Sequence, residues 1–233
     1  MKHFNEHQPV VIGMMLTGVH PDSVMPLDLC LLPLDYSLNP EKTRMPFMSQ
    51  IQPPEHLYPE YDLPQRQKDR NLSNIVTLSK DKFTQARMKG QPESLLADLF
   101  VRWVASFKLR RHKKLLPICY DWSLTRPALV NWLGEDLVEA TFDWRVRDLL
   151  CYANLLNDLA GLHFENYPFP RVHFQALCWA CGILNEKHTA VGNAKAIARI
   201  YTTMLRRDHR DPEFLKRLAE YQDNPLPVDM EKL

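Results

Sequence analysis

The chain has 233 residues, 45% of them hydrophobic and 24% charged. This composition is sufficient for one fairly large globular domain and argues against a disordered protein. The 29 basic and 28 acidic residues leave a net charge of +1, so no overall field marks the chain as a binder of nucleic acid or of a membrane surface. Any such binding has to come from local patches.

The N-terminal segment and the cysteines indicate a cytoplasmic protein. The first 18 residues have no small-residue cleavage site, and no segment reaches 18 apolar residues, so we expect no membrane contact. All five cysteines lie in apolar stretches, as reduced and buried thiols do. Cys178 and Cys181 have the spacing of a redox or zinc pair, but no second pair of ligands accompanies them. We interpret them as two cysteines of an apolar helix.

The first third of the chain predicts strands. Apolar runs at residues 9–16 and 25–34 are separated by a turn-rich segment, and a third run at 47–52 is stopped by two prolines. An antiparallel three-stranded meander is the simplest arrangement of these runs. Residues 53–92 are polar and rich in proline, which predicts an irregular insertion of long loops with short helices.

After residue 92 the pattern alternates between helices and strands. The expected helices cover residues 93–108, 126–133, 147–157, 174–182 and 190–207, and the expected strands cover 115–120 and 142–144. Pro127 favours the start of its helix, and Gly182 favours a helix end. A meander followed by alternating elements predicts an α/β fold with a mixed sheet covered by helices. We expect one domain over residues 1–210 and a C-terminal tail over 211–233.

Three short motifs carry a resemblance to a known family. Residues 10–18, followed by 47–53, are similar to the opening strands of the DnaQ-like, DEDDh 3′–5′ exonucleases, in which the first strand ends in Asp-x-Glu-Thr-x-Gly. Gly13 and Met15 stand at the two acidic positions of that motif. The resemblance implies a ribonuclease H-like fold.

The other two motifs follow in the family's order. Residues 124–129 (LTRPAL) resemble a motif Phe-Asp-x-Pro-x-Leu, with Thr125 in place of Asp. Residues 188–194 (HTAVGNA) resemble His-x-Ala-x-x-Asp-Ala, with His188 kept and Asn193 in place of Asp. The resemblance spans residues 10 to about 205, and the chain looks most like the phage and prophage members.

The family's chemistry, by this resemblance, needs two divalent cations held by carboxylates and a histidine as general base. At the four acidic positions this chain offers no side chain, a thioether, a hydroxyl and an amide, which are poor ligands for Mg²⁺ or Mn²⁺. We therefore expect an inactive homologue without a metal or other cofactor, in which His188 is kept either as inherited geometry or for a simple hydrogen-bonding role. The alternative is an active metal-dependent 3′–5′ exonuclease, in which the nearby acids rebuild a Mg²⁺ or Mn²⁺ site. The candidates are Asp121, Asp143 and Asp148.

The expected residual function is binding. Candidate nucleic-acid contacts are the basic residues Lys108, Arg110, Arg111, Lys113, Lys114 and Arg126, although cations at a helix end also stabilise the helix dipole. Exposed aromatic rings hold single strands by stacking, but most of the candidates are expected in the core. They are Tyr120, Trp122, Trp132, Trp144 and Trp179. The competing class is a protein-interaction module that contacts a host or replication factor through residues 53–92 or 224–233. A homodimer is a further alternative for the partner of this chain.

Overall fold

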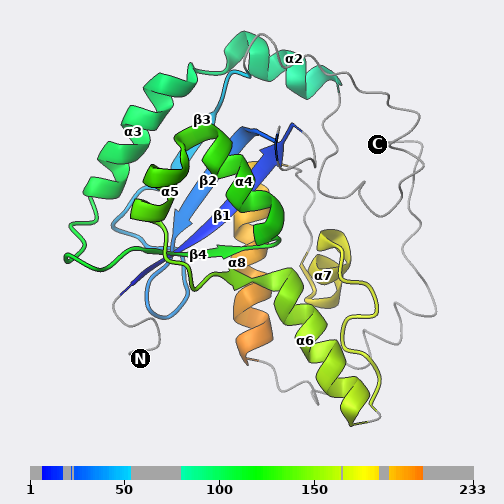
Figure 1. The fold of residues 1–233 in the computed structure, drawn as a ribbon. Coiled ribbons are helices and arrows are strands. Elements are labelled where there is room, and N and C mark those ends of the chain that lie inside the picture. The colour runs from blue at the N-terminus through cyan, green and yellow to red at the C-terminus, as the bar shows by residue number, and fades with distance from the viewer. Residues whose placement is uncertain are drawn as a thin grey trace.

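The computed structural model describes residues 7–17, 22, 24–53, 80–163, 165–183 and 189–206. His188, residues 54–79 of the expected insertion, and the tail from residue 207 lie outside the described residues. The elements in chain order are β1 (Gln8–Leu16), β2 (Pro26–Pro33), β3 (Phe47–Gln50), α2 (Lys80–Lys89), α3 (Glu93–Ala105), β4 (Leu115–Cys119), α4 (Trp122–Leu133), α5 (Glu135–Thr141), β5 (Arg147–Asp148), α6 (Leu149–Leu162), α7 (Phe174–Ala180) and α8 (Ala190–Arg206) (Figure 1).

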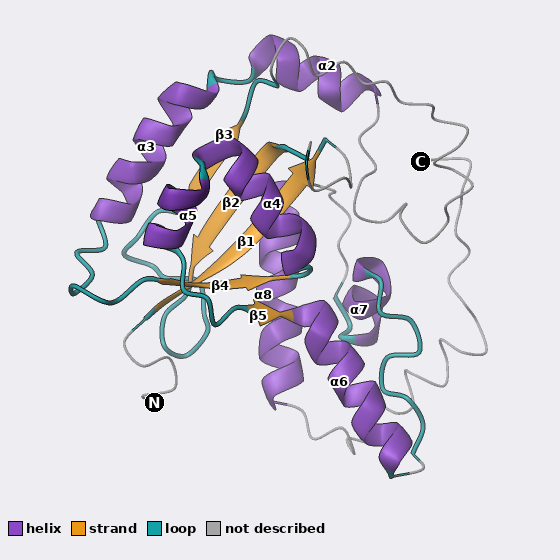
Figure 2. Cartoon of the chain, viewed as in Figure 1, coloured by secondary structure: helices purple, strands orange, loops and turns teal. Residues whose placement is uncertain are grey.

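The strands form one mixed sheet in the order β3-β2-β1-β4-β5 (Figure 2). β1, β2 and β3 are an antiparallel meander, as predicted, and β4 and β5 run parallel to β1. Val10, Val11 and Ile12 of β1 are all buried because helices cover both faces of the sheet. Such a strand appears in the sequence as a continuous apolar run.

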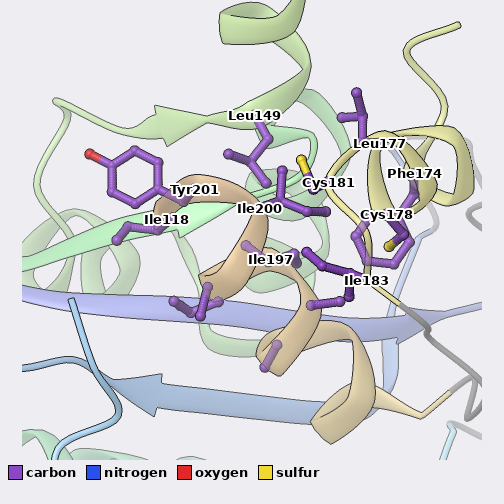
Figure 3. Close-up of a cluster of buried hydrophobic side chains, with 14 of the residues drawn as sticks. Ile118, Leu149, Phe174, Leu177, Cys178, Cys181, Ile183, Ile197, Ile200 and Tyr201 are labelled. Atoms are coloured by element: carbon purple, nitrogen blue, oxygen red, sulfur yellow. The ribbon is translucent and has the colours of Figure 1, made fainter. Parts of the chain in front are cut away.

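Each face of the sheet has its own core. Val11 of β1 packs with residues of α6, α7 and α8, and Figure 3 shows Ile118 of β4 in this cluster with Leu177, Ile197 and Ile200. Val10 and Ile12 face the other way, into a cluster built from α3, α4 and α5. Aromatic rings fill this second core; Phe100 makes a tilted contact with Trp132 at 5.8 Å between centroids. The predicted α/β layer structure is confirmed.

Several expected boundaries were wrong. α4 begins at Trp122 because the Asp121 side chain accepts the Ser123 N–H and caps the helix, which leaves Pro127 inside the helix rather than in its first turn. No strand forms at 142–144, where Phe142 makes only an isolated bridge to Leu115. The strand is Arg147–Asp148 instead, and α5, which the sequence did not predict, precedes it. α7 does end as expected, just before Gly182, which has a φ of 66°.

The cysteine prediction is confirmed for four of the five thiols. Cys30, Cys119, Cys178 and Cys181 are buried, reduced thiols, whereas Cys151 is exposed on α6. Burial raises the pKa of the Cys178 thiol to about 12, so it stays protonated and unreactive. Within the described residues, no helix combines the length and the apolar character needed to cross a membrane.

Candidate functional site

A pocket opens at the carboxyl ends of β1 and β4, the neighbouring parallel strands at the centre of the sheet. In α/β sheets, ligands bind outside this edge, where the connections leave in opposite directions. The pocket has a volume of about 60 Å³, against roughly 300–1,000 Å³ for typical small-molecule sites. It therefore holds one small group rather than a whole nucleotide. Its lining residues are Ile12, Met14, Leu16, Tyr120, Asp121, Leu124, Thr125, Phe174, Asn193 and Ile197.

Two of the motif residues line this pocket, and a third, Met15, contacts one of them. Thr125 and Asn193 line it, from α4 and α8. The Asn193 amide donates to the Met14 carbonyl at 3.2 Å, and its nitrogen lies 3.7 Å from the Met15 sulfur. Residues that are far apart in the sequence thus meet at one end of β1.

Gly13 is covered by α8. A Cβ built on Gly13 would lie 2.2 Å from the Ala190 carbonyl oxygen and 2.5 Å from the Ala194 nitrogen, both of them backbone atoms. Real Cβ contacts are never this short, and a helix backbone cannot rotate away as a long side chain can. With α8 in this position, residue 13 has no room for any side chain, including a carboxylate.

The lining residues of β1 were missed by motif reasoning. Ile12, Met14 and Leu16 line the pocket, whereas Gly13 and Met15 belong to the alternate set of positions. Successive side chains of a strand point to opposite faces, so this alternation was the available signal. Tyr120 also lines the pocket, but its hydroxyl donates to the Val172 carbonyl at 2.8 Å. Burial raises the pKa of Tyr120 well above its usual value.

The two carboxylates near the pocket are helix caps. Asp121 Oδ1 accepts the Ser123 N–H at 2.9 Å and the Ser123 hydroxyl at 2.6 Å. Asp148 Oδ1 accepts the Leu150 and Cys151 N–H groups, and its Oδ2 accepts the Trp122 N–H at 2.7 Å. Burial, and then the charge of Asp121, raise the pKa of Asp148, against the effect of these hydrogen bonds. Both acids have structural roles that are independent of any metal.

The third candidate acid lies elsewhere. The Asp143 N–H donates to the Leu115 carbonyl at the start of β4, so Asp143 is at the opposite end of the sheet from the pocket. Its carboxylate contacts the Arg145 guanidinium at 2.8 Å and His7 Nδ1 at 3.2 Å. The Arg145 hydrogen bond lowers the pKa of Asp143 to about 2. Among the described residues, no three His, Cys, Asp or Glu side chains converge as a metal-binding group.

The candidate binding residues also divide between the two ends of the sheet. Residues 106–114, which hold Lys108 to Lys114, lead into the start of β4. Arg126 is on α4 and forms ion pairs with Glu135 and Glu139 of α5. Of the aromatic candidates, Trp132 is buried, while Trp144, beside Asp143, is 83% exposed. The pocket and the basic segment are therefore separate features.

Comparison with known proteins finds relatives by structure only. The sequence matches no protein-family model and no curated protein. A structure of E. coli exonuclease I in complex with a dT13 oligonucleotide superimposes with a TM-score of 0.58 at 17% identity, over 92% of this chain and 44% of that chain. A structure of exonuclease I with SSB and the inhibitor CFAM has a TM-score of 0.58 at 15% identity, over 93% and 45%. The chain thus spans less than half the length of exonuclease I.

A smaller protein is covered almost completely. The nuclease domain of 3'hExo, a DEDDh family member bound to rAMP, superimposes with a TM-score of 0.53 at 12% identity, over 87% of this chain and 93% of that domain. At such identities the likeness concerns the fold. The chain has the α/β fold of the ribonuclease H-like, DEDDh exonucleases: a mixed five-stranded sheet covered by helices.

Proposed function

We propose that this chain is a catalytically inactive homologue of the 3′–5′ exonucleases that binds single-stranded nucleic acid without cleaving it. The observation that carries the proposal is the packing of the α8 backbone on Gly13. By the motif resemblance, residue 13 is the position of the family's first acidic ligand. Any side chain at position 13 would require α8 to move. The position of α8 on β1 is therefore compatible with glycine and not with an acidic ligand.

The remaining donors at the pocket support the same conclusion. Two-metal hydrolysis needs several carboxylates that offset the charge of hard cations. Thr125 and Asn193 are neutral, and the Asn193 amide is engaged by the Met14 carbonyl. Asp121 and Asp148 satisfy helix N-termini. This donor set does not suit Mg²⁺ or Mn²⁺, and we propose no metal cofactor.

Binding of a single strand agrees with the shared fold. E. coli exonuclease I, which shares this fold over 44% of its chain, has been solved in complex with a dT13 oligonucleotide. The motif positions Thr125 and Asn193 are neutral, and Asp121 is the only acidic one among the described residues that line the pocket, so the pocket repels phosphate less than a cluster of four carboxylates would. Because the pocket admits only one small group, a bound strand must contact further surface.

The test is incubation of the purified protein with 3′- and 5′-labelled single-stranded DNA and RNA in Mg²⁺ or Mn²⁺, beside a binding assay on the same oligonucleotides. We expect binding and no shortened products. Products that disappear in a His188→Ala variant would overturn the proposal and would mean that other acids hold the metals. A second variant, Thr125→Asp with Asn193→Asp, returns two carboxylates and is expected to remain inactive, because position 13 is still blocked.

An exposed apolar stripe favours a second candidate, a protein-interaction module. Leu155, Leu159 and Leu162 of α6 are 51%, 43% and 74% exposed and recur at helical spacing. Exonuclease I is known in complex with SSB. A second copy of this chain is the simplest occupant of such a stripe. Sedimentation of the wild type and of a Leu155→Glu, Leu159→Glu variant tests this homodimer. A dimer that the variant loses supports it, and a monomeric wild type excludes the homodimer.

A further inference from the structure

Three loops meet at the end of the sheet opposite the pocket. Residues 34–46 follow β2 where β1 begins, and the Leu34 N–H donates to the Pro9 carbonyl. Residues 106–114 lead into β4, and the Arg44 guanidinium lies 4.7 Å from the centroid of the Phe107 ring. Residues 142–146 join the start of β4 through Asp143. We call the surface of these three loops the amino-edge surface; Figure 1 shows the loop between α3 and β4 projecting from the body.

The amino-edge surface has an excess of positive charge. Its acids are Asp35, Glu41 and Asp143, and all three are engaged: Asp35 by the N–H groups of its own turn, Glu41 by Arg44, and Asp143 by Arg145. Its basic residues are Lys42, Arg44, Lys108, Arg110, Arg111, Lys113, Lys114 and Arg145. In a chain whose net charge is only +1, this excess gives a local positive potential that attracts a polyanion.

Trp144 adds an exposed ring to this surface. The ring is 83% exposed, and the Arg145 guanidinium lies 5.8 Å from its centroid. Arg145 is itself fixed: Nε contacts Asp143 Oδ1 at 2.8 Å, and one terminal nitrogen contacts Asp143 Oδ2 at 3.0 Å and His7 Nε2 at 2.8 Å. A solvent-exposed indole, beside a guanidinium that hydrogen bonds hold in place, is the kind of surface on which nucleic-acid bases stack.

We propose that the amino-edge surface binds single-stranded nucleic acid, with a base stacked on Trp144 and phosphates held by Lys108, Arg111 and Arg145. A duplex keeps its bases stacked on each other, so it offers Trp144 no free face. The surface thus selects single strands. This site lies at the opposite end of β1 and β4 from the pocket and depends neither on the pocket nor on the loss of catalysis.

The experiment measures the anisotropy of a fluorescein-labelled oligothymidylate and of a matched duplex over a series of salt concentrations. Trp144→Leu is expected to raise the Kd for the single strand about fivefold or more, whereas Trp144→Phe, which keeps a ring, has a smaller effect. Lys108→Gln with Arg111→Gln is expected to make the salt dependence shallower by about 0.7 for each phosphate that the variant no longer neutralises. Trp144, Lys108 and Arg111 are all exposed, so we expect these variants to fold as the wild type does.

A charge-matched control separates this surface from general attraction. Lys195→Gln with Arg199→Gln removes two exposed cations of α8 and is expected to leave the Kd unchanged. If Trp144→Leu binds as the wild type does, or if the α8 control weakens binding as much as the amino-edge variant, the proposal is wrong. Equal affinity for the duplex would also overturn it. The cleavage assay is independent, so failure here leaves the proposed loss of catalysis standing.

Discussion

The two ends of the sheet differ in charge, although the same two strands, β1 and β4, build both. At the carboxyl ends, the pocket is largely apolar, and its nearby carboxylates cap helices. At the amino ends, basic loops surround an exposed tryptophan and a fixed arginine. The comparison teaches that the pocket at the carboxyl ends and the basic surface at the amino ends are separate features of this chain. The variants below act on one end or the other.

The largest effect is expected at Gly13. Gly13→Ala places a methyl group 2.2 Å from the Ala190 carbonyl, and overpacking against backbone is expected to lower the free energy of unfolding by about 3 kcal/mol or more. Urea denaturation measures the change. Gly161→Ala is the matched control, because its Cβ meets only the Tyr167 ring, at 3.3 Å. Equal stability of the two variants would mean that α8 does not lie on β1 as described.

Asp148 is expected to have the next largest effect. Asp148→Ala removes the acceptor of three backbone N–H groups, from Trp122, Leu150 and Cys151, and should cost about 2–3 kcal/mol. Asp121→Ala removes a cap that serves Ser123 alone and should cost about 1 kcal/mol. Thermal unfolding of both variants ranks the two caps. The reverse order would contradict the structural role assigned to Asp148.

Asp143 provides the corresponding test at the amino end. Its pKa is lowered to about 2, chiefly by Arg145, and its side chain is only 6% exposed. The lowered pKa stabilises the fold by roughly 2 kcal/mol above the usual pKa of an aspartate, and this contribution disappears as the pH falls toward 2. Asp143→Asn should therefore be less stable than the wild type by about that amount at pH 7.

The difference between Asp143→Asn and the wild type should narrow below pH 4, because Asp143 of the unfolded wild-type chain is then protonated and must lose that proton to fold. Urea unfolding of both proteins at pH 7 and at pH 2.5 measures it. A difference that stays the same at both values would show that the ionised carboxylate is not what stabilises this end.

Arg126 should have the smallest effect. Its side chain and those of Glu135 and Glu139 are 38%, 51% and 65% exposed, and exposed ion pairs contribute about 0–1 kcal/mol. Arg126→Gln should therefore change the free energy of unfolding by less than about 1 kcal/mol. The same variant in the anisotropy assay sharpens the comparison of the two ends. Weaker oligonucleotide binding would mean that the strand also reaches the α4 flank of the pocket.

The sequence predicted the sheet and the principal helices because their signals are local. The apolar runs of β1 and β4 and the periodic residues of α3 and α8 are sufficient to place them. The early start of α4 was missed because Pro127 was taken as a first-turn residue, whereas the cap at Asp121 decided the boundary. β5 is only two residues long and carries no periodicity, and α5 is a single short helix.

The site was predictable in part. Met15, Thr125 and Asn193, which the motif resemblance singled out, lie at one end of β1. The motif order did not indicate that Gly13 is packed against α8, because the sequence does not show which backbone lies over a glycine. Nor did it indicate that Asp143 lies at the far end of the sheet, since the partners of Asp143, His7 and Leu115, are distant in sequence.

The packing of α8 on Gly13 has a consequence for how such a chain can evolve. Codons for glycine and aspartate are neighbours in the genetic code, so an acid at position 13 is within easy mutational reach. In this protein that mutation would place the new side chain against the helix backbone and would be selected against because it destabilises the fold. An acidic side chain at position 13 would need α8 to shift beforehand, through changes at residues such as Ala190 or Ala194 that lie against it. The packing of α8 on β1 thus makes the glycine at position 13 difficult to replace by any residue with a side chain.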